Sequence, residues 1–232
     1  MDKKINDDLL KFWNNYYKFN NDDINYINDM DDDYLNVAPS YKQIDALKLF
    51  KNSNNVIDYG CGSAWASIIM AKEGTKHIKA IDLCENPIDL ANLYINKFKL
   101  NDKIDALLID DNWLEKEKND SYDGFFSSNV IDVIPIDKSL KIIKEAARIT
   151  KKDSYVIFSL NYYLSKEEIK IRRWNMIDDS VIIDGVLRLT SLSDDEWINI
   201  FKNYYEIINL IHYAWNEEEK ELRRLFILKP IK

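Results

Sequence analysis

The chain has 232 residues, of which 46% are hydrophobic and 12% aromatic, so it can bury a substantial core and is expected to fold as one domain. The 32 basic and 40 acidic residues give a net charge of −8, which disfavours nucleic acid and anionic membrane surfaces as partners. No apolar stretch approaches the ~20 residues of a membrane-spanning helix, and nothing resembles a secretory signal. The two cysteines and two histidines match no metal-ligand spacing. We therefore expect a cytoplasmic protein without a metal site or a membrane partner.

Residues 1–50 are expected to form a helical cap. Its first part carries aromatic and apolar side chains on roughly one helical face, and the acidic run of residues 29–33 ends it. Ser40 follows a proline and opens a second helix over residues 41–50. No Gly/Ser-rich linker comes next, so we expect the cap to belong to a single domain of residues 1–232.

Residues 51–160 alternate between strand and helix patterns and are expected to form the cofactor-binding core. Short apolar runs predict strands at residues 56–57, 77–83, 104–109, 122–128 and 155–160. Helical patterns lie between them at residues 64–73, 87–99 and 137–149, the second with Asn86 as its N-cap. Such alternation predicts an α/β fold, a doubly wound parallel sheet with helices on both faces. Residues 111–121, between the third and fourth strands, show no convincing helix.

The alternation ends after the fifth strand. Residues 161–190 are an insert that we expect near the substrate site, and residues 191–232 should form a helix capped by Ser193 and a terminal pair of strands. These strands, at about residues 205–213 and 222–228, are joined by a short charged loop. Two strands joined in this way pair antiparallel.

The first strand runs into the turn Asp58-Tyr59-Gly60-Cys61-Gly62, and a helix begins near Trp65. Glycines let the backbone turn sharply and let a ligand approach the main chain, and the helix N-terminus behind them offers free N–H groups. Asp82 stands at the end of the second strand. A carboxylate at that point can accept hydrogen bonds from both hydroxyls of a ribose.

Two cofactors meet this description, a nicotinamide dinucleotide and S-adenosylmethionine. The dinucleotide fingerprint requires a third glycine where this chain has Trp65, which is far too large for the close helix–sheet packing around a pyrophosphate. Asp58, two residues before the first glycine, favours a positively charged ligand. S-adenosylmethionine carries an ammonium and a sulfonium and no phosphate, so it is the better match.

With these motifs the sequence resembles the class I S-adenosylmethionine-dependent methyltransferases from about Asn55 to the C-terminus. The glycine turn matches the family's first motif, Asp/Glu-x-Gly-x-Gly-x-Gly, with Ala64 at the third glycine, and Ala80-Ile81-Asp82-Leu83 matches the second. The resemblance implies a mostly parallel seven-stranded sheet with an antiparallel C-terminal hairpin. It also implies S-adenosylmethionine as cofactor and S-adenosylhomocysteine as product.

The resemblance assigns further residues to the cofactor. Asp111 would accept from the adenine amino group, with Asp110 one register position away. The segment after the fourth strand would run beneath the methionine part, but Asp132-Val133 stands where many relatives carry a Glu-His pair, so no catalytic base is assigned. The expected cofactor-binding residues are Asp58, Gly60, Cys61, Gly62, Asp82, Leu83, Asp111, Asn112, Ser128 and Asn129.

We expect in-line methyl transfer to an oxygen or nitrogen of a small molecule. The acidic net charge and the absence of an Asn-Pro-Pro-Tyr-type segment after the fourth strand argue against nucleic acid bases as acceptors. Trp13 and Tyr17 of the cap, with Asn161 and Tyr162 of the insert, are the expected substrate contacts. One alternative is a protein or peptide methyltransferase, since an acidic surface suits a basic substrate, and another is a non-catalytic cofactor-binding protein. The sequence leaves the acceptor and the oligomeric state open.

Overall fold

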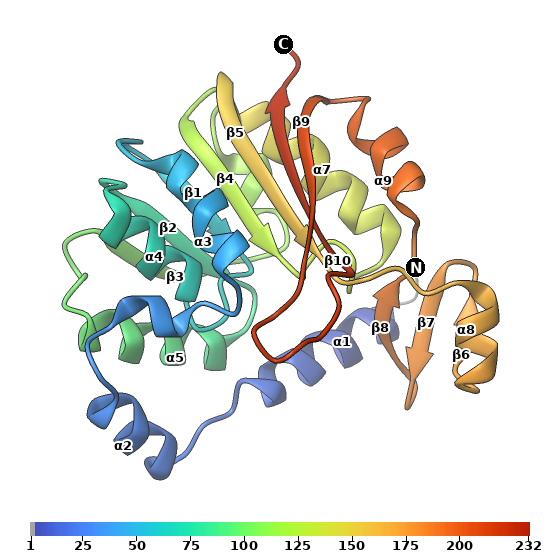
Figure 1. Ribbon diagram of the computed structural model, residues 1–232, viewed down its shortest axis with the longest axis horizontal. Coiled ribbons are helices and arrows are strands. Elements are labelled where there is room, and N and C mark those ends of the chain that lie inside the picture. The colour runs from blue at the N-terminus through green and yellow to red at the C-terminus, as the bar shows by residue number, and fades with distance from the viewer. Residues whose placement is uncertain (1–2) are drawn as a thin grey trace.

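The computed structural model describes residues 3–232, and the side chains from residue 7 onward. In this part of the chain the main sheet has seven strands in the order β3-β2-β1-β4-β5-β10-β9 (Figure 1). The first five strands along the chain run parallel, and β10 pairs antiparallel with both β5 and β9. The predicted doubly wound sheet with an antiparallel C-terminal hairpin is therefore confirmed. The strands are β1 Val56–Tyr59, β2 Ile78–Asp82, β3 Ile104–Leu108, β4 Tyr122–Ser128, β5 Thr150–Leu160, β9 Tyr205–Tyr213 and β10 Arg223–Pro230.

Helices cover both faces of this sheet (Figure 1). One layer contains α3 Tyr41–Leu47, α4 Trp65–Glu73 and α5 Glu85–Lys97, and the other contains α6 Trp113–Lys116, α7 Ile136–Ile149 and α9 Asp194–Phe201. Successive side chains of a strand point to opposite faces of the sheet, so Phe126 of β4 packs in the core under the first layer and Phe125 in the core under the second. Burial on both faces explains why these strands read as continuous apolar runs.

The first two helices, α1 Lys3–Tyr16 and α2 Asn21–Asp29, lie outside these layers (Figure 1). The 3₁₀ turns η1 Tyr34–Val37 and η2 Lys48–Phe50 come before and after α3 and pack with it on the core of the first layer. Helix α1 runs past the carboxyl ends of the parallel strands (Figure 1). It is tied to the start of α5 by Asn86, whose N–H and Nδ2 donate to the Oδ1 (3.0 Å) and main-chain oxygen (2.7 Å) of Asn14. The prediction of Asn86 as an N-cap is wrong, because α5 begins two residues earlier than predicted, at Glu85, with Cys84 as its cap.

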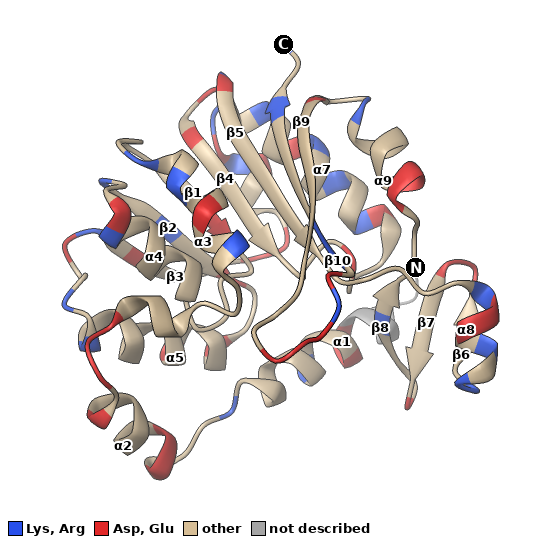
Figure 2. Ribbon diagram, viewed as in Figure 1, with Lys and Arg blue, Asp and Glu red and all other residues tan. Residues whose placement is uncertain are grey.

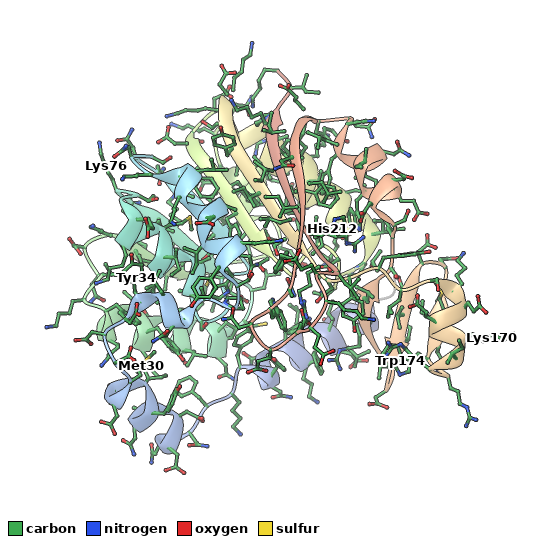
Figure 3. The ribbon with its side chains drawn as sticks, in the orientation of Figure 1. Met30, Tyr34, Lys76, Lys170, Trp174 and His212 are labelled. Carbon is green, nitrogen blue, oxygen red and sulfur yellow. The ribbon has the colours of Figure 1, made fainter. Side chains whose placement is uncertain are left out.

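Residues 161–190 contain regular structure that the sequence analysis left undescribed. Helix α8 Lys166–Ile171 is followed by a three-stranded antiparallel sheet of β6 Asn175–Ile177, β7 Ser180–Ile183 and β8 Val186–Thr190. Asp184 and Gly185 connect β7 to β8, both with positive φ (51° and 79°), as a two-residue hairpin turn of this kind requires. A small core that includes Trp174, labelled in Figure 3, holds this unit together beside α1.

Two further differences from the predicted elements lie on either side of β4. Strand β5 begins at Thr150, five residues early, with an irregular register against β4 and a positive φ of 68° at Asp153. The connection from β3 to β4 contains a single helical turn, α6, which is too short to produce a periodic pattern.

The predicted cap at Ser193 is confirmed. Ser193 Oγ accepts from the Glu196 N–H as part of a capping box at the start of α9. Within residues 3–232 no helix combines the length and apolarity needed to cross a membrane.

Candidate active site

A cavity of about 560 Å³ lies at the carboxyl ends of the parallel strands. One wall is formed by the loops that follow β1, β2, β3 and β4, and the opposite wall by α1 and the insert. The order of the sheet reverses between β1 and β4, and ligands of open α/β sheets bind at such a switch point. The volume falls within the range of small-molecule sites.

The glycine turn forms the part of the cavity next to β1. Gly60 and Gly62 have φ values of 68° and 54°, and a Cβ at Gly60 would overlap the Val130 side chain. A Cβ at Gly62 would lie 2.5 Å from the Tyr17 hydroxyl. Ala64, at the third glycine position of the motif, also has a left-handed φ of 60°. Positions 60 and 62 therefore require glycine for two reasons: the left-handed backbone conformation, and the lack of room for a Cβ atom.

Asp58 is buried behind this turn and is absent from the cavity wall. Its carboxylate accepts from the hydroxyl (2.6 Å) and N–H (3.2 Å) of Ser67 in the first turn of α4. Ala64, the N-cap of α4, has no side-chain acceptor, so Asp58 satisfies this helix start instead. Burial raises the pKa of Asp58 to about 7 against the lowering effect of these hydrogen bonds. Cys61 and Gly62 likewise lie off the cavity wall.

Asp82 reaches the cavity from the end of β2, next to Leu83. It accepts from the N–H groups of Gly62 (3.3 Å) and Cys84 (3.0 Å) and has no ion pair with any described side chain. Burial raises its pKa to about 6, which the backbone hydrogen bonds only partly offset. A carboxylate has about four acceptor positions, so Asp82 retains capacity for hydroxyl donors of a ligand.

The remaining predicted cofactor residues also line the cavity: Asp111, Asn112, Ser128 and Asn129. Asp111 accepts from Lys138 (2.9 Å), whereas Asp110 pairs with Lys116 (2.6 Å) outside the cavity.

All four predicted substrate contacts line the same cavity, namely Trp13, Tyr17, Asn161 and Tyr162. Tyr17 lies against the glycine turn. Burial first, and then the charge of Asp82, raise the pKa of its hydroxyl, so it remains a neutral donor. The Nε1 atom of Trp13 is buried and has no hydrogen-bond partner in the described structure.

Asn161 is fixed by a network that connects β5 to β10. The N–H (2.6 Å) and Nδ2 (3.0 Å) of Asn161 both donate to Asp132 Oδ2. The side-chain oxygen of Asn161, Oδ1, accepts from Asn129 Nδ2 (3.0 Å) and Arg223 Nη1 (2.7 Å). Arg224 Nε donates to its main-chain oxygen at 2.9 Å. Burial raises the pKa of Asp132. Asp132 lies beneath the cavity as a positioning residue for Asn161.

Several lining residues escaped the sequence analysis. Trp174, Arg188 and Arg223 come from segments where no motif was identified, and the available signal was an arginine within an otherwise apolar strand. His212, labelled in Figure 3, pairs with Asp194 (2.9 Å) away from this cavity. Among residues with described side chains, no three His, Cys, Asp or Glu are grouped so that they could hold a metal ion.

Three features define the Rossmann-like class of S-adenosylmethionine-binding enzymes. They are a glycine turn after the first strand, an acid at the end of the second, and a seven-stranded sheet whose strand order reverses between β1 and β4. Comparison of the sequence with protein families matches residues 36–204 to a methyltransferase domain. The chain belongs to this methyltransferase family.

Curated relatives include a ribosomal protein L11 methyltransferase of Ruminiclostridium cellulolyticum, 28% identical over 153 residues, which covers 65% of this chain and 43% of the relative. A second, from Thermotoga petrophila, is 28% identical over 139 residues, covering 56% of this chain and 47% of the relative. The chain thus spans less than half the length of these relatives.

Solved structures share the fold. The protein PH0226 of Pyrococcus horikoshii superposes with a TM-score of 0.63 at 16% identity, covering 82% of this chain and 89% of that one. An S-adenosylmethionine-dependent methyltransferase of Clostridium acetobutylicum gives a TM-score of 0.62 at 14% identity, covering 84% and 94%.

Proposed function

We propose that this enzyme methylates an oxygen or nitrogen of a small molecule enclosed between α1 and the insert. The observation that carries the proposal is the cover over the cavity: Phe12 of α1 packs against Arg188 of β8, with 4.1 Å from guanidinium carbon to ring centroid. A partly covered site suits a free molecule that diffuses in and is then shielded from much of the water.

The cofactor would lie along the carboxyl ends of β1 to β4. In this proposal Asp82 accepts from the ribose hydroxyls, and the bare backbone of Gly60 allows close approach. Asp111 and Asn112 would face the adenine, and Ser128 and Asn129 the methionine part. Asp58, Cys61 and Gly62 would act from behind, by holding the turn and α4 in place.

S-adenosylmethionine, when bound, supplies an electrophilic methyl group: the acceptor's lone pair forms the new bond, the carbon–sulfur bond breaks with its electron pair left on sulfur, and the acceptor's proton passes to water. The residues of the chain align the acceptor and exclude other water. Asn161 is suited to alignment because five hydrogen bonds fix it beside Tyr162.

The charges of the cavity also support a small acceptor over a basic protein side chain. The carboxylates on its wall, Asp82 and Asp111, belong to the proposed cofactor side. Arg188 and Arg223 lie on the wall formed by the insert and β10. Arg223 is paired with Glu218, but a lysine ammonium would still enter next to the like charge of Arg188, which is unfavourable.

A protein acceptor is the second candidate. The curated relatives named above are called ribosomal protein L11 methyltransferases, and a net charge of −8 suits a basic partner. Names of relatives favour this candidate, whereas the covered cavity favours the first.

Transfer of a labelled methyl group from S-adenosylmethionine distinguishes the two candidates. The purified enzyme is incubated with a cell extract divided by ultrafiltration into metabolites and proteins, and the Gly60→Val variant, which should not bind the cofactor, is the inactive control. We expect label in the metabolite fraction. Label confined to proteins would replace the small-molecule proposal with the protein one.

The proposal includes a cytoplasmic location. Cys61 and Cys84 are both free and buried, as is typical of proteins from reducing compartments.

A further inference from the structure

Arg188 is the central residue of β8 and lines the cavity on the side away from the glycine turn. Strand β8 lies beside α1 (Figure 2). One face of its guanidinium lies over the Phe12 ring at 4.1 Å. Among residues 7–232, no side chain or main-chain group forms a hydrogen bond or an ion pair with it. Its charge therefore faces the cavity without a counter-ion from the described chain.

Arg223, the other arginine of this wall, is in a different position. Glu218 accepts from its Nε (2.8 Å) and Nη2 (2.7 Å), and Asn161 accepts from its Nη1 (2.7 Å). Its guanidinium also stacks on Trp215 at 3.3 Å. The N–H groups and charge of Arg223 are thus already satisfied, which leaves Arg188 as the free cation of the pair.

A second donor on the same wall also lacks a partner. Trp13 follows Phe12 on α1, with ring centroids 5.2 Å apart, and its buried Nε1–H makes no hydrogen bond in the described structure. Buried donors are nearly always paired in native proteins. The unpaired indole N–H of Trp13 is buried and the guanidinium of Arg188 is half-buried, so both can donate to an acceptor on a ligand in this cavity.

The rest of this wall is apolar. Leu164, Val181 and Leu189 are buried residues of the insert that line the cavity, and Trp174 joins them. A ligand that fills this region needs an apolar body as well as an anionic end.

Resting on the function proposed above, we propose that the methyl acceptor is an organic acid: an apolar body with a carboxylate that binds Arg188 and Trp13 Nε1. The guanidinium of Arg188 lies over the Phe12 ring, and its planar fork of N–H groups suits two parallel hydrogen bonds with a carboxylate. The atom that receives the methyl group lies at the other end of the molecule, toward Asn161.

The test uses labelled methyl transfer with the full chain and a metabolite extract separated on an anion-exchange column at pH 8. The labelled product should arise from the retained, anionic fraction. Arg188→Gln should lower kcat/KM for that fraction about tenfold or more, as expected when one charge-assisted interaction is lost, with recovery at high acceptor concentration. Arg188→Lys should recover part of the loss.

Arg172→Gln is the matched control, because Arg172 is exposed in the same insert and also contacts a tryptophan, Trp174, at 5.0 Å. It should behave as the wild type, and the affinity of all variants for S-adenosylhomocysteine should agree within about twofold. Label arising only from the unretained fraction, or undiminished by Arg188→Gln, would overturn the organic-acid proposal. Label found only in proteins would instead overturn the proposed function.

Discussion

The two walls of the cavity are built in different ways. The wall proposed for the cofactor consists of short loops at the ends of β1 to β4, strands that are held in register by parallel pairing. The opposite wall consists of α1 and a separate three-stranded sheet, joined by side-chain contacts such as that of Phe12 with Arg188. In the proposed function, the ends of the parallel strands bind the cofactor, and the added layer of α1 and the insert binds the methyl acceptor.

The largest effect should come from filling the glycine turn. Gly60→Val introduces a side chain at a φ of 68° that overlaps Val130, so we expect loss of S-adenosylhomocysteine binding and at least about 3 kcal/mol of stability. Calorimetry and urea unfolding measure both. Gly185→Ala is the control: its φ is 79° but no atom lies within 4 Å of the new Cβ, so only about 1 kcal/mol should be lost and binding kept. Equal behaviour of the two variants would contradict the account.

A buried charge behind the same turn should make stability depend on pH. The pKa of Asp58 is raised from 3.8 to about 7, so the folded state holds a proton that the unfolded state releases between those values. The contribution is complete below about pH 4 and is lost as pH rises to 7. Asp58→Asn should therefore be more stable than the wild type at pH 7 by up to about 4 kcal/mol, with no gain near pH 4. The free energy of unfolding is measured by denaturant titration across this pH range. If it changed with pH in the same way for Asp58→Asn and the wild type, Asp58 would not be the origin of the pH dependence.

Two neighbouring aspartates, Asp110 and Asp111, test which residue of the proposed cofactor wall contacts the adenine. Asp111 lines the cavity, whereas Asp110 pairs with Lys116 outside it. Asp111→Ala should weaken S-adenosylhomocysteine binding by about tenfold, through loss of one hydrogen bond to the adenine, and Asp110→Ala should leave it unchanged. The reverse order in a titration would move the adenine contact by one residue.

The smallest effect concerns the departure from the family motif. Ala64 has a φ of 60° and is fully buried at the start of α4. Ala64→Gly relieves the left-handed strain and should raise the free energy of unfolding by about 0.5–1 kcal/mol without changing cofactor affinity. A loss of stability would mean that the packing of the Ala64 methyl group outweighs the strain.

The difference between the walls also explains what the sequence could predict. Strand β4 was predicted at the observed residues 122–128, and the glycine turn and Asp82 were located, because local backbone geometry restricts the residues allowed there. Arg188 was missed because its meaning depends on Phe12, which lies at the other end of the chain. Asp58 was expected to favour a cationic ligand, but its direct partner is Ser67, a contact that requires the folded helix α4. The hairpin turn at Asp184-Gly185 was readable from sequence and was overlooked.

The central claim is that the two walls bind different ligands, and it is tested most directly by calorimetric titration of S-adenosylhomocysteine into Asp82→Ala and Arg188→Gln side by side. We predict that Asp82→Ala weakens binding at least about tenfold, because hydrogen bonds to a carboxylate are lost, while Arg188→Gln binds as tightly as the wild type. Unchanged affinity of Asp82→Ala, or an equal loss in Arg188→Gln, would contradict the division of the cavity.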